Sequence, residues 1–307
     1  MIEGQEGVSW SQWLDLARAC ERHGIPAMFR SDHYMNLDGT YPERAALDAW
    51  GTINALAATT STLRLGTMVS PASFRHPSVL AKLVVTADHV SGGRVELGLG
   101  AGWHRHEHEA YGFPFAPTGV RMDVLAEQLE VITGAWREGP FSFHGEHYEL
   151  HELDAQPKPI QHPRPPLIIG GDAGPRSSAL AARFADEYNT TFPTIDDVRR
   201  RKAAVDRACE EAGRDSLAFS IMTAVVLGTD EHDLRVRLDR LAEKMGSAPG
   251  SLSAEDPPAG WIVGTLERAR ERLGELERAG VGRVMCQHLV HEDLDALALI
   301  GSIWPAR

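Results

Sequence analysis

Residues 94–115 have the sequence RVELGLGAGWHRHEHEAYGFPF, which joins an apolar strand to a cluster of ionisable side chains. Over residues 95–99, apolar side chains alternate with polar or small ones, a period of two that is typical of a strand. Glycines then follow with a single side chain between successive members: Gly98, Gly100 and Gly102. Glycines in this position let the backbone approach a ligand closely. Histidines and glutamates fill most of residues 104–109, so this stretch predicts a site at the carboxyl end of a strand.

The rest of the chain repeats the order of strand, polar loop and helix. Predicted strands lie near residues 25, 63, 94, 167, 187, 217 and 281, and helical patterns separate most of them. Repeated units of this kind predict an α/β fold with a parallel sheet. Seven strands are one fewer than a (β/α)8 barrel needs, and only residues 1–2 precede the first helical segment. We therefore expect a TIM barrel with a truncated first strand, and we attribute the truncation to a missing or misplaced start of the chain.

A single domain is expected to span residues 1–307, because α/β barrels commonly reach this length. An aromatic hairpin and a proline-rich run form a predicted insertion at about 139–166. A helix and a loop rich in glycine and proline form a second insertion at about 229–260, which we expect to act as a lid.

Composition narrows the class of partner. The net charge of -12 argues against general nucleic-acid binding, which needs a basic surface. An anionic small ligand stays possible where arginines and backbone amides gather locally. The chain has no apolar run near the roughly 20 residues of a membrane span, and no signal peptide opens it, so we expect a cytoplasmic protein. No CxxC pair occurs, which predicts buried thiols in a reducing compartment for Cys20, Cys209 and Cys286.

A second glycine-rich turn lies between the predicted strand at 167–169 and the helix at 177–185. Such a turn presents free backbone N–H groups and the positive end of the helix dipole to an anion. An arginine in the turn could add a bidentate contact to a phosphate. A purely structural turn is the alternative. The predicted phosphate site consists of Gly170, Gly171, Ala173, Gly174 and Arg176.

The HxH pattern within residues 104–108 has an alternative interpretation as a zinc site, as in metal-dependent barrel hydrolases. Those enzymes place HxH after the first strand and need further histidines and an aspartate on later strands. The later histidines of this chain form no matching set: His144, His147, His151, His162, His288 and His291. We therefore predict no metal site. If the cluster begins a helix, His104 and His108 share one face of it.

Over nearly its whole length, the chain resembles the bacterial-luciferase-like family of flavin- and deazaflavin-dependent oxidoreductases, which are (β/α)8 barrels. The order and spacing of the motifs together make the resemblance specific. The motifs are SDH at 31–33, GLGAGWxxxEHxAYGFPF at 98–115, RPPLIIGG at 164–171, AARFADEYN at 181–189 and GTxExARERL at 264–273. Asp32-His33 and Arg75-His76-Pro77 favour the branch that uses coenzyme F420 rather than FMN.

The resemblance implies roles for individual residues. His33 would lie beside the hydride-carrying carbon of the cofactor and protonate or stabilise the reacting species, which suits a group that titrates near neutrality. A histidine that caps a helix or orders a loop is the alternative. Glu107 is the second catalytic candidate, and we expect Asp32 mainly to orient its loop. The other implied cofactor contacts are Thr67, Met68, Val69, Gly100, Gly102, His106 and Asn189.

Further positions carry weaker expectations. The segment 67–70 would form a bulge, sometimes with a cis peptide, that supports the cofactor ring. Arg75 and His76 could contact the acidic tail of the cofactor. Tyr111 is expected to pack in the core, and Gln287 and His288 are expected to face the mouth of the barrel. These assignments predict hydride transfer between F420 and a small organic substrate in a homodimer. A reduced-FMN-dependent monooxygenase and a non-catalytic flavin-binding barrel are the alternatives.

Overall fold

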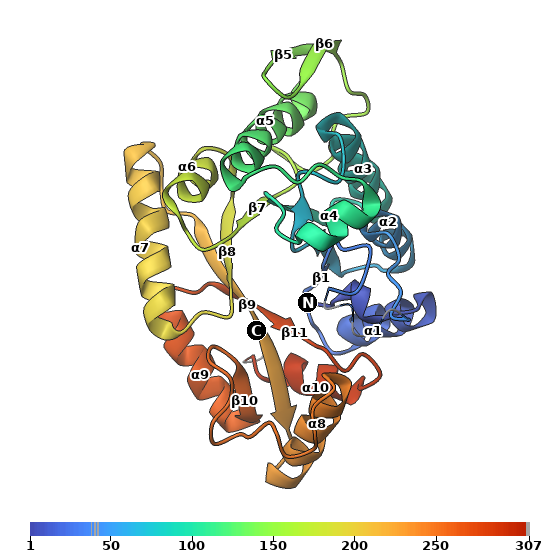
Figure 1. Ribbon diagram of the computed structural model, residues 1–307, viewed down its shortest axis with the longest axis vertical. Coiled ribbons are helices and arrows are strands. Elements are labelled where there is room, and N and C mark those ends of the chain that lie inside the picture. Colours follow the sequence, from blue (N-terminus) through green and yellow to red (C-terminus); the bar gives the residue numbers. More distant parts are fainter. Residues whose placement is uncertain (38, 40, 42, 305–307) are drawn as a thin grey trace.

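Parallel strands form a ring that helices surround (Figure 1). The computed structural model describes residues 1–37, 39, 41 and 43–304. The strands of the ring, in order, are β1 (Ala27–Arg30), β2 (Arg64–Thr67), β4 (Val95–Gly100), β7 (Leu167–Gly170), β8 (Glu187–Thr191), β9 (Ala218–Gly228) and β11 (Arg283–Gln287). Each pairs in parallel with the next, which confirms the predicted (β/α)8 barrel.

Residues 1–2 complete the ring between β11 and β1. Ile2 forms a parallel bridge with Arg30, and its N–H donates to the carbonyl of Phe29 at 2.9 Å. On the other side, the N–H of His288 donates to the carbonyl of Met1 at 3.0 Å. These residues therefore occupy the position of a first strand, and the wall closes in spite of the short segment.

The segment Ile262–Thr265 is a strand, β10, that the sequence patterns did not predict. It pairs in parallel with the second half of β9, from Val225 to Gly228, whereas β11 pairs with the first half. Because β9 is long, it pairs with both β11 and β10. Residues 229–260, the expected lid, comprise helix α8 (Glu231–Lys244) and the segment that leads to β10.

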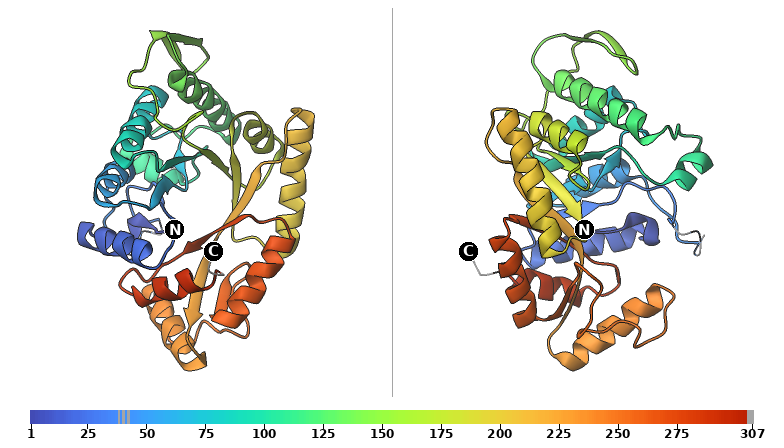
Figure 2. Two further views of the ribbon diagram at one scale, coloured as in Figure 1. Left: turned by 180° about the vertical axis from the view of Figure 1, so that it is seen from behind. Right: turned by 60° about the vertical axis from the view of Figure 1, so that its left-hand side comes forward.

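Helices cover the outer face of the ring, as the two further views show (Figure 2). Their bounds are α1 (Trp10–Arg22), α2 (Ala49–Thr59), α3 (Pro77–Ser91), α4 (Arg105–Tyr111), α5 (Thr118–Trp136), α6 (Pro175–Phe184), α7 (Ile195–Glu211), α9 (Leu266–Arg278) and α10 (Asp295–Ser302). A short 3-10 helix, Gly4–Glu6, precedes α1. No helix of the described residues is long and apolar enough to cross a membrane.

Local sequence explains where the helices begin. Ser9 and Gln12 form a capping box at the start of α1. Pro77 occupies the first turn of α3, where its missing N–H costs nothing. Helix α2 begins at Ala49, because the carboxylate of Asp48 accepts the N–H of Gly51 and caps the helix there.

Three clusters of buried hydrophobic side chains form the core of the described residues, and one of them packs α8 against β9 through Val226, Leu234, Leu238 and Leu241. A large cluster fills the space between the strands and the helices. A smaller cluster of buried side chains comprises Met1, Phe29, Met68, Ile168, Met222 and Met285. The three cysteines are buried and free, as their spacing predicted.

The predicted hairpin insertion is present outside the ring, at the top of Figure 1. Strands β5 (Phe141–His144) and β6 (Glu149–Leu153) pair antiparallel after α5. A proline-rich connection then leads to β7, with cis peptides before Pro157 and Pro163. The hairpin is thus an addition to the barrel and leaves the order of the wall strands unchanged.

Candidate functional site

The catalytic candidates His33 and Glu107 meet at the carboxyl end of the barrel. His33 follows β1 and Glu107 lies on α4, just after β4, so the parallel wall brings together residues that are 74 positions apart. Nδ1 of His33 lies 2.7 Å from a carboxylate oxygen of Glu107. The Glu107 side chain is fully buried, and that of His33 is 13% exposed. The carboxylate thus holds Nδ1 of His33, whereas Nε2 takes no part in this contact.

Glu107 has further neighbours that the sequence did not indicate. The backbone N–H of Tyr34 donates to its second oxygen at 2.5 Å. Nδ1 of His104 lies 3.9 Å from the oxygen that contacts His33, and this buried nitrogen has no hydrogen-bond partner. Burial lowers the pKa of His104, although the nearby charge of Glu107 opposes this effect. Among the described residues, no lysine or arginine forms an ion pair with Glu107.

Aromatic side chains surround this pair. Trp103 is 63% exposed, and its ring centroid lies 6.0 Å from that of His33. The expectation that Tyr111 packs in the core is wrong, since it is 51% exposed. Its ring stacks on Tyr34 at 5.1 Å, and its hydroxyl donates to the carbonyl of Tyr34. A large exposed aromatic beside a polar pair indicates a surface suited to a planar ligand.

Asp32 lies next to His33 but points elsewhere. Its carboxylate accepts hydrogen bonds from Arg75 at 2.6 and 3.1 Å and from the Ser70 hydroxyl at 2.6 Å. Arg75 also contacts Asp48 at 2.6 Å, and its side chain is only 9% exposed. Burial lowers the pKa of Arg75, but the two carboxylates raise it above its usual value overall. Asp32 is therefore placed to order the loop, and the charge of Arg75 is already balanced within the protein.

The predicted irregularity after β2 is present. The peptide between Met68 and Val69 is cis, and the chain resumes pairing at β3 (Ser70–Pro71). The side chain of Val69 occupies space that glycines leave open. A Cβ on Gly100 would lie 2.7 Å from Val69, and one on Gly170 would lie 3.1 Å from it. These glycines thus make room for the bulge, a reason that the sequence alone did not reveal.

The glycine-rich turn before α6 offers fewer free donors than predicted. The N–H of Gly171 donates to the carbonyl of Asn189 at 3.0 Å, and that of Ala173 donates to the hydroxyl of Tyr188 at 2.8 Å. Gly174 begins α6 without a side-chain cap, and nothing lies within 4 Å of a Cβ built there. Arg176 donates to the carbonyl of Gly119 at 2.9 Å and pairs with Asp123. The uncapped end of α6, rather than the turn itself, faces open space.

The remaining predicted site residues have other neighbours. Thr67 is buried and donates to the carbonyl of Gly98. Asn189 is buried and donates to Ser220 at 2.7 Å, and His106 is exposed on α4. Gln287 donates to Glu3 at 2.6 Å.

His288 and Gly102 have other neighbours. His288 is buried against His291, with centroids 6.4 Å apart. Gly102 has a φ of 78° and lies beside His108, whose ring accepts the Ser73 hydroxyl at 2.6 Å and donates to the carbonyl of His104. The His108 ring thus contacts Ser73 and the backbone of His104, whereas Nδ1 of His104 has no hydrogen-bond partner.

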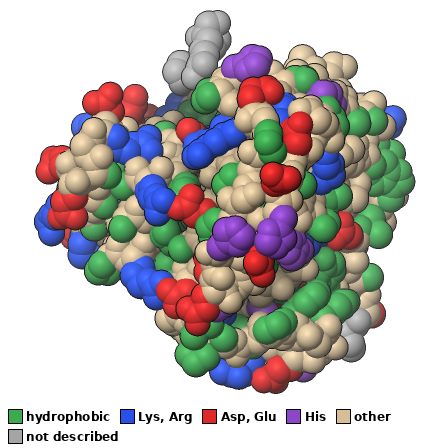
Figure 3. Space-filling model, turned by 90° about the horizontal axis from the view of Figure 1, so that it is seen from above, with side chains coloured by type: hydrophobic (Ala, Val, Ile, Leu, Met, Phe, Trp, Pro, Cys, Tyr) green, Lys and Arg blue, Asp and Glu red, His purple; other side chains and the backbone are tan. Residues whose placement is uncertain are grey.

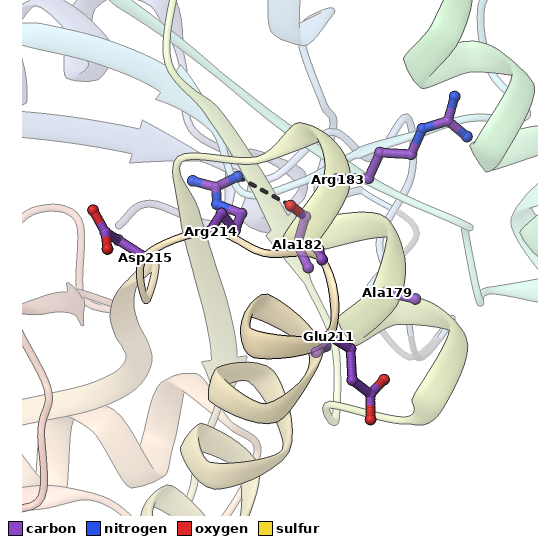
Figure 4. A pocket seen from close by; sticks show the side chains of 8 residues that line it. Ala179, Ala182, Arg183, Glu211, Arg214 and Asp215 are labelled. Atoms are coloured by element: carbon purple, nitrogen blue, oxygen red, sulfur yellow. Dashed lines mark hydrogen bonds between the residues drawn. The ribbon is translucent and has the colours of Figure 1, made fainter.

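A surface groove lies elsewhere, between α6 and α7 (Figure 4). Alanines line much of it, and Arg214 donates to the carbonyl of Ala182 at 3.1 Å across it. The groove is formed by the carboxyl-terminal halves of these helices, which lie near the amino ends of the strands. It is thus on the opposite side of the barrel from His33 and Glu107.

The protein is a (β/α)8 barrel, and its candidate site, the His33–Glu107 pair, lies at the carboxyl ends of the strands. The chain belongs to the luciferase-like monooxygenase family, which it matches over residues 2–302. The family contains oxidoreductases and monooxygenases with either a deazaflavin or a flavin. The predicted family is therefore confirmed.

Relatives with each cofactor are similar to this chain. The F420-dependent glucose-6-phosphate dehydrogenase of Kineococcus radiotolerans is 33% identical over 262 residues, 83% of this chain and 73% of the relative. The FMNH(2)-dependent dimethylsulfone monooxygenase of Pseudomonas putida is 28% identical over 226 residues, 70% of this chain and 61% of the relative. The structure of F420-dependent tetrahydromethanopterin reductase from Methanopyrus kandleri superposes with a TM-score of 0.82 at 21% identity, over 98% of this chain and 96% of that one.

Proposed function

We propose that the protein transfers a hydride between coenzyme F420 and a small organic substrate, with His33 as the acid–base group. The observation that carries the proposal is the 2.7 Å contact between Nδ1 of His33 and the fully buried carboxylate of Glu107. When Nδ1 donates to this carboxylate, Nε2 is the nitrogen that can release or accept a proton. A substrate that gains or loses a hydride at a carbonyl or alcohol carbon needs one proton transfer at the oxygen.

The protein offers features that fit a phosphate-bearing planar cofactor. The uncapped end of α6 presents backbone N–H groups beside Gly174, where nothing lies within 4 Å of a Cβ. The bulge at Met68 and Val69 lies at the carboxyl end of β2, where the family resemblance expects support for the ring. Bound F420 would supply the hydride acceptor or donor, and the protein would position it and exclude water.

Each residue of the site has a separate task in this proposal. Glu107 orients the His33 ring, since its buried carboxylate lies 2.7 Å from Nδ1. The N–H of Tyr34 holds the carboxylate in place. Trp103 lies beside His33 and provides an aromatic wall for a ring system. Asp32 and Arg75 hold the loop that carries His33.

A reduced-FMN-dependent monooxygenase is the second candidate, because relatives with FMNH(2) are also similar to this chain. The histidine–glutamate pair favours the first proposal. Proton transfer at the substrate is needed in a hydride transfer to a carbonyl, and a histidine held by a carboxylate supplies it.

Titration of the purified protein with F420 and with FMN, followed by tryptophan fluorescence, tests the proposal. We expect saturable F420 binding by the wild type and by His33→Ala, with F420-dependent turnover lost only in the variant. His89→Ala, an exposed histidine on α3, is the matched control and should retain turnover. Binding of FMN with no binding of F420 would refute the proposal and favour the monooxygenase. Binding of neither cofactor would favour a barrel without redox activity.

A further inference from the structure

Three metal-ligating side chains share one exposed face of the β5–β6 hairpin. His144 lies on β5 directly opposite Glu149 on β6. His151 is two residues beyond Glu149, and side chains two apart on a strand point to the same face. The three side chains are 64%, 65% and 71% exposed, in that order.

The distances within this group match those around a metal ion. Nδ1 of His144 and Nε2 of His151 each lie 3.4 Å from the same oxygen of Glu149. Ligands bound tetrahedrally at about 2.0–2.1 Å from zinc lie about 3.3–3.4 Å from one another. All three ligand atoms lie within 4.8 Å of one another, so only the separation of the two histidine nitrogens must shorten.

The hairpin that carries the group is anchored to the barrel. The carboxylate of Glu127 on α5 accepts the backbone N–H groups of Glu146, His147 and Tyr148 at 2.7, 2.9 and 3.0 Å. Leu150, between the two ligands of β6, is buried on the opposite face. The turn and the register are therefore fixed before a metal binds, which reduces the entropy lost on binding.

We propose that His144, Glu149 and His151 form a binding site for a divalent transition metal, with water in the fourth position. Two imidazoles and one carboxylate suit Zn²⁺, Cu²⁺ or Ni²⁺, whereas Mg²⁺ and Ca²⁺ prefer oxygen ligands. Seen from above, over the end of the molecule that carries the hairpin, histidine side chains gather beside acidic ones (Figure 3). Without a metal, exposed ion pairs of this kind contribute little to stability.

This site is separate from the proposed redox site. It shares no residue with the His33–Glu107 pair, and it lies in the hairpin outside the barrel wall. The proposal departs from the sequence prediction of no metal site. The hairpin histidines lie on later segments and gain their third ligand, Glu149, through strand pairing, which the sequence pattern did not reveal.

Calorimetric titration of tag-free protein with Zn²⁺ tests the proposal, because a polyhistidine tag would hide the site. We expect one Zn²⁺ per chain, with binding lost in acid as the imidazoles become protonated. Removal of a residue that hydrogen-bonds to a metal ligand weakens metal binding by about 10–100-fold. Removal of a ligand itself, in His144→Ala or His151→Ala, should therefore weaken Zn²⁺ binding by at least about 100-fold. His147→Ala, in the same turn but outside the group, is the matched control and should bind normally.

Electron paramagnetic resonance of the Cu²⁺ form identifies the ligands directly. Nitrogen couplings from two imidazoles are expected in the wild type and from one imidazole in His144→Ala. No saturable binding by the wild type, or equal binding by all four proteins, would overturn the proposal. A loss of binding in His147→Ala as large as in His144→Ala would overturn the ligand assignment.

Discussion

Each end of the barrel holds a cluster of buried ionisable groups, and the two clusters are built differently. At the amino ends of the strands, Glu96 accepts from Arg64 at 2.6 Å and from Arg283 at 2.8 Å, and Arg283 also pairs with Glu187. At the carboxyl ends, the partners of Glu107 within the described part of the chain are histidines and a backbone N–H. At the amino ends each of these carboxylates has a guanidinium partner. At the carboxyl ends Asp32 has Arg75, but Glu107 has no guanidinium partner among the described residues.

The pKa directions reflect this difference. Burial alone would raise the pKa of Glu96, but the hydrogen bonds and charges of Arg283 and Arg64 lower it below its usual value. The balanced cluster therefore holds fixed charges and serves stability. The cluster at the mouth joins a carboxylate to groups that exchange protons, with the Nδ1 of His104 left without a partner. An unbalanced buried cluster at the catalytic end of a barrel is a sign of function.

Glu107→Gln most directly tests the role of the cluster at the carboxyl ends of the strands. The variant keeps the shape of the side chain and an oxygen for the N–H of Tyr34, but it removes the charge beside His33. We expect kcat to fall by about 10²–10⁴-fold, the usual contribution of general acid–base catalysis. The melting temperature should change little. Glu109→Gln, an exposed residue of the same helix, is the control, and equal activity of the two variants would contradict the assignment.

Arg283→Met tests the contribution of the charged cluster at the amino ends of the strands to stability. Removal of one partner from a buried ion pair costs about 3–5 kcal/mol, and we expect a value near the lower limit because Arg64 still pairs with Glu96. Urea unfolding measures the loss, and turnover of the folded protein should stay within about threefold of the wild type. Arg199→Met removes an exposed pair and should change stability by less than about 1 kcal/mol. A large loss of turnover in Arg283→Met would contradict a purely structural role for the cluster at the amino ends.

His288 provides a test by pH. Burial lowers its pKa from 6.5 to about 4. The unfolded chain therefore binds a proton that the folded chain does not, between these values, and stability falls as the pH drops from 6.5 to 4. At pH 5 the loss should reach about 2 kcal/mol, at about 1.4 kcal/mol per pH unit.

Chemical unfolding at pH 7 and pH 5 measures this loss. His288→Gln should show a smaller difference between the two pH values than the wild type. The exposed His232→Gln should keep the wild-type difference. An unchanged pH dependence in His288→Gln would show that other groups control acid stability.

Arg176→Ala is expected to have the smallest effect. Its guanidinium is held by Gly119 and Asp123 on the surface, away from the open end of α6. The dissociation constant for F420 should rise by less than about tenfold, about 1.4 kcal/mol. A larger change would show that the side chain leaves Asp123 to bind the cofactor, as the sequence prediction supposed.

The sequence predicted the barrel and its order of strands because each unit carries its own periodicity and turn residues. It also located His33, the irregular peptide after β2 and the hairpin. It did not predict β10, because the four residues Ile262–Thr265 gain strand structure only from the long β9. Nor could it show that Tyr111 is exposed, since exposure depends on how α4 lies against the loop of Tyr34.

The contacts that determine the chemistry of the site could not be predicted from the sequence alone. Glu107 was a candidate by its place in a motif, but its contact with His33 joins two loops that only the parallel wall brings together. The glycines were predicted to admit a ligand, whereas Gly100 and Gly170 accommodate Val69. The amides of Gly171 and Ala173 were predicted to be free, and both have partners within the protein.

The closure of the wall by residues 1–2 has a consequence for motion at the site. Ile2 joins β1 through a one-residue bridge, whereas β8 and β9 share a ladder from Glu187 to Thr191. Short ladders open at a lower free-energy cost than long ones, so amide hydrogens near β1 should exchange first. β1 leads directly into the loop of His33. We therefore expect the contact between His33 and Glu107 to open more readily when the pairing of Ile2 with β1 opens.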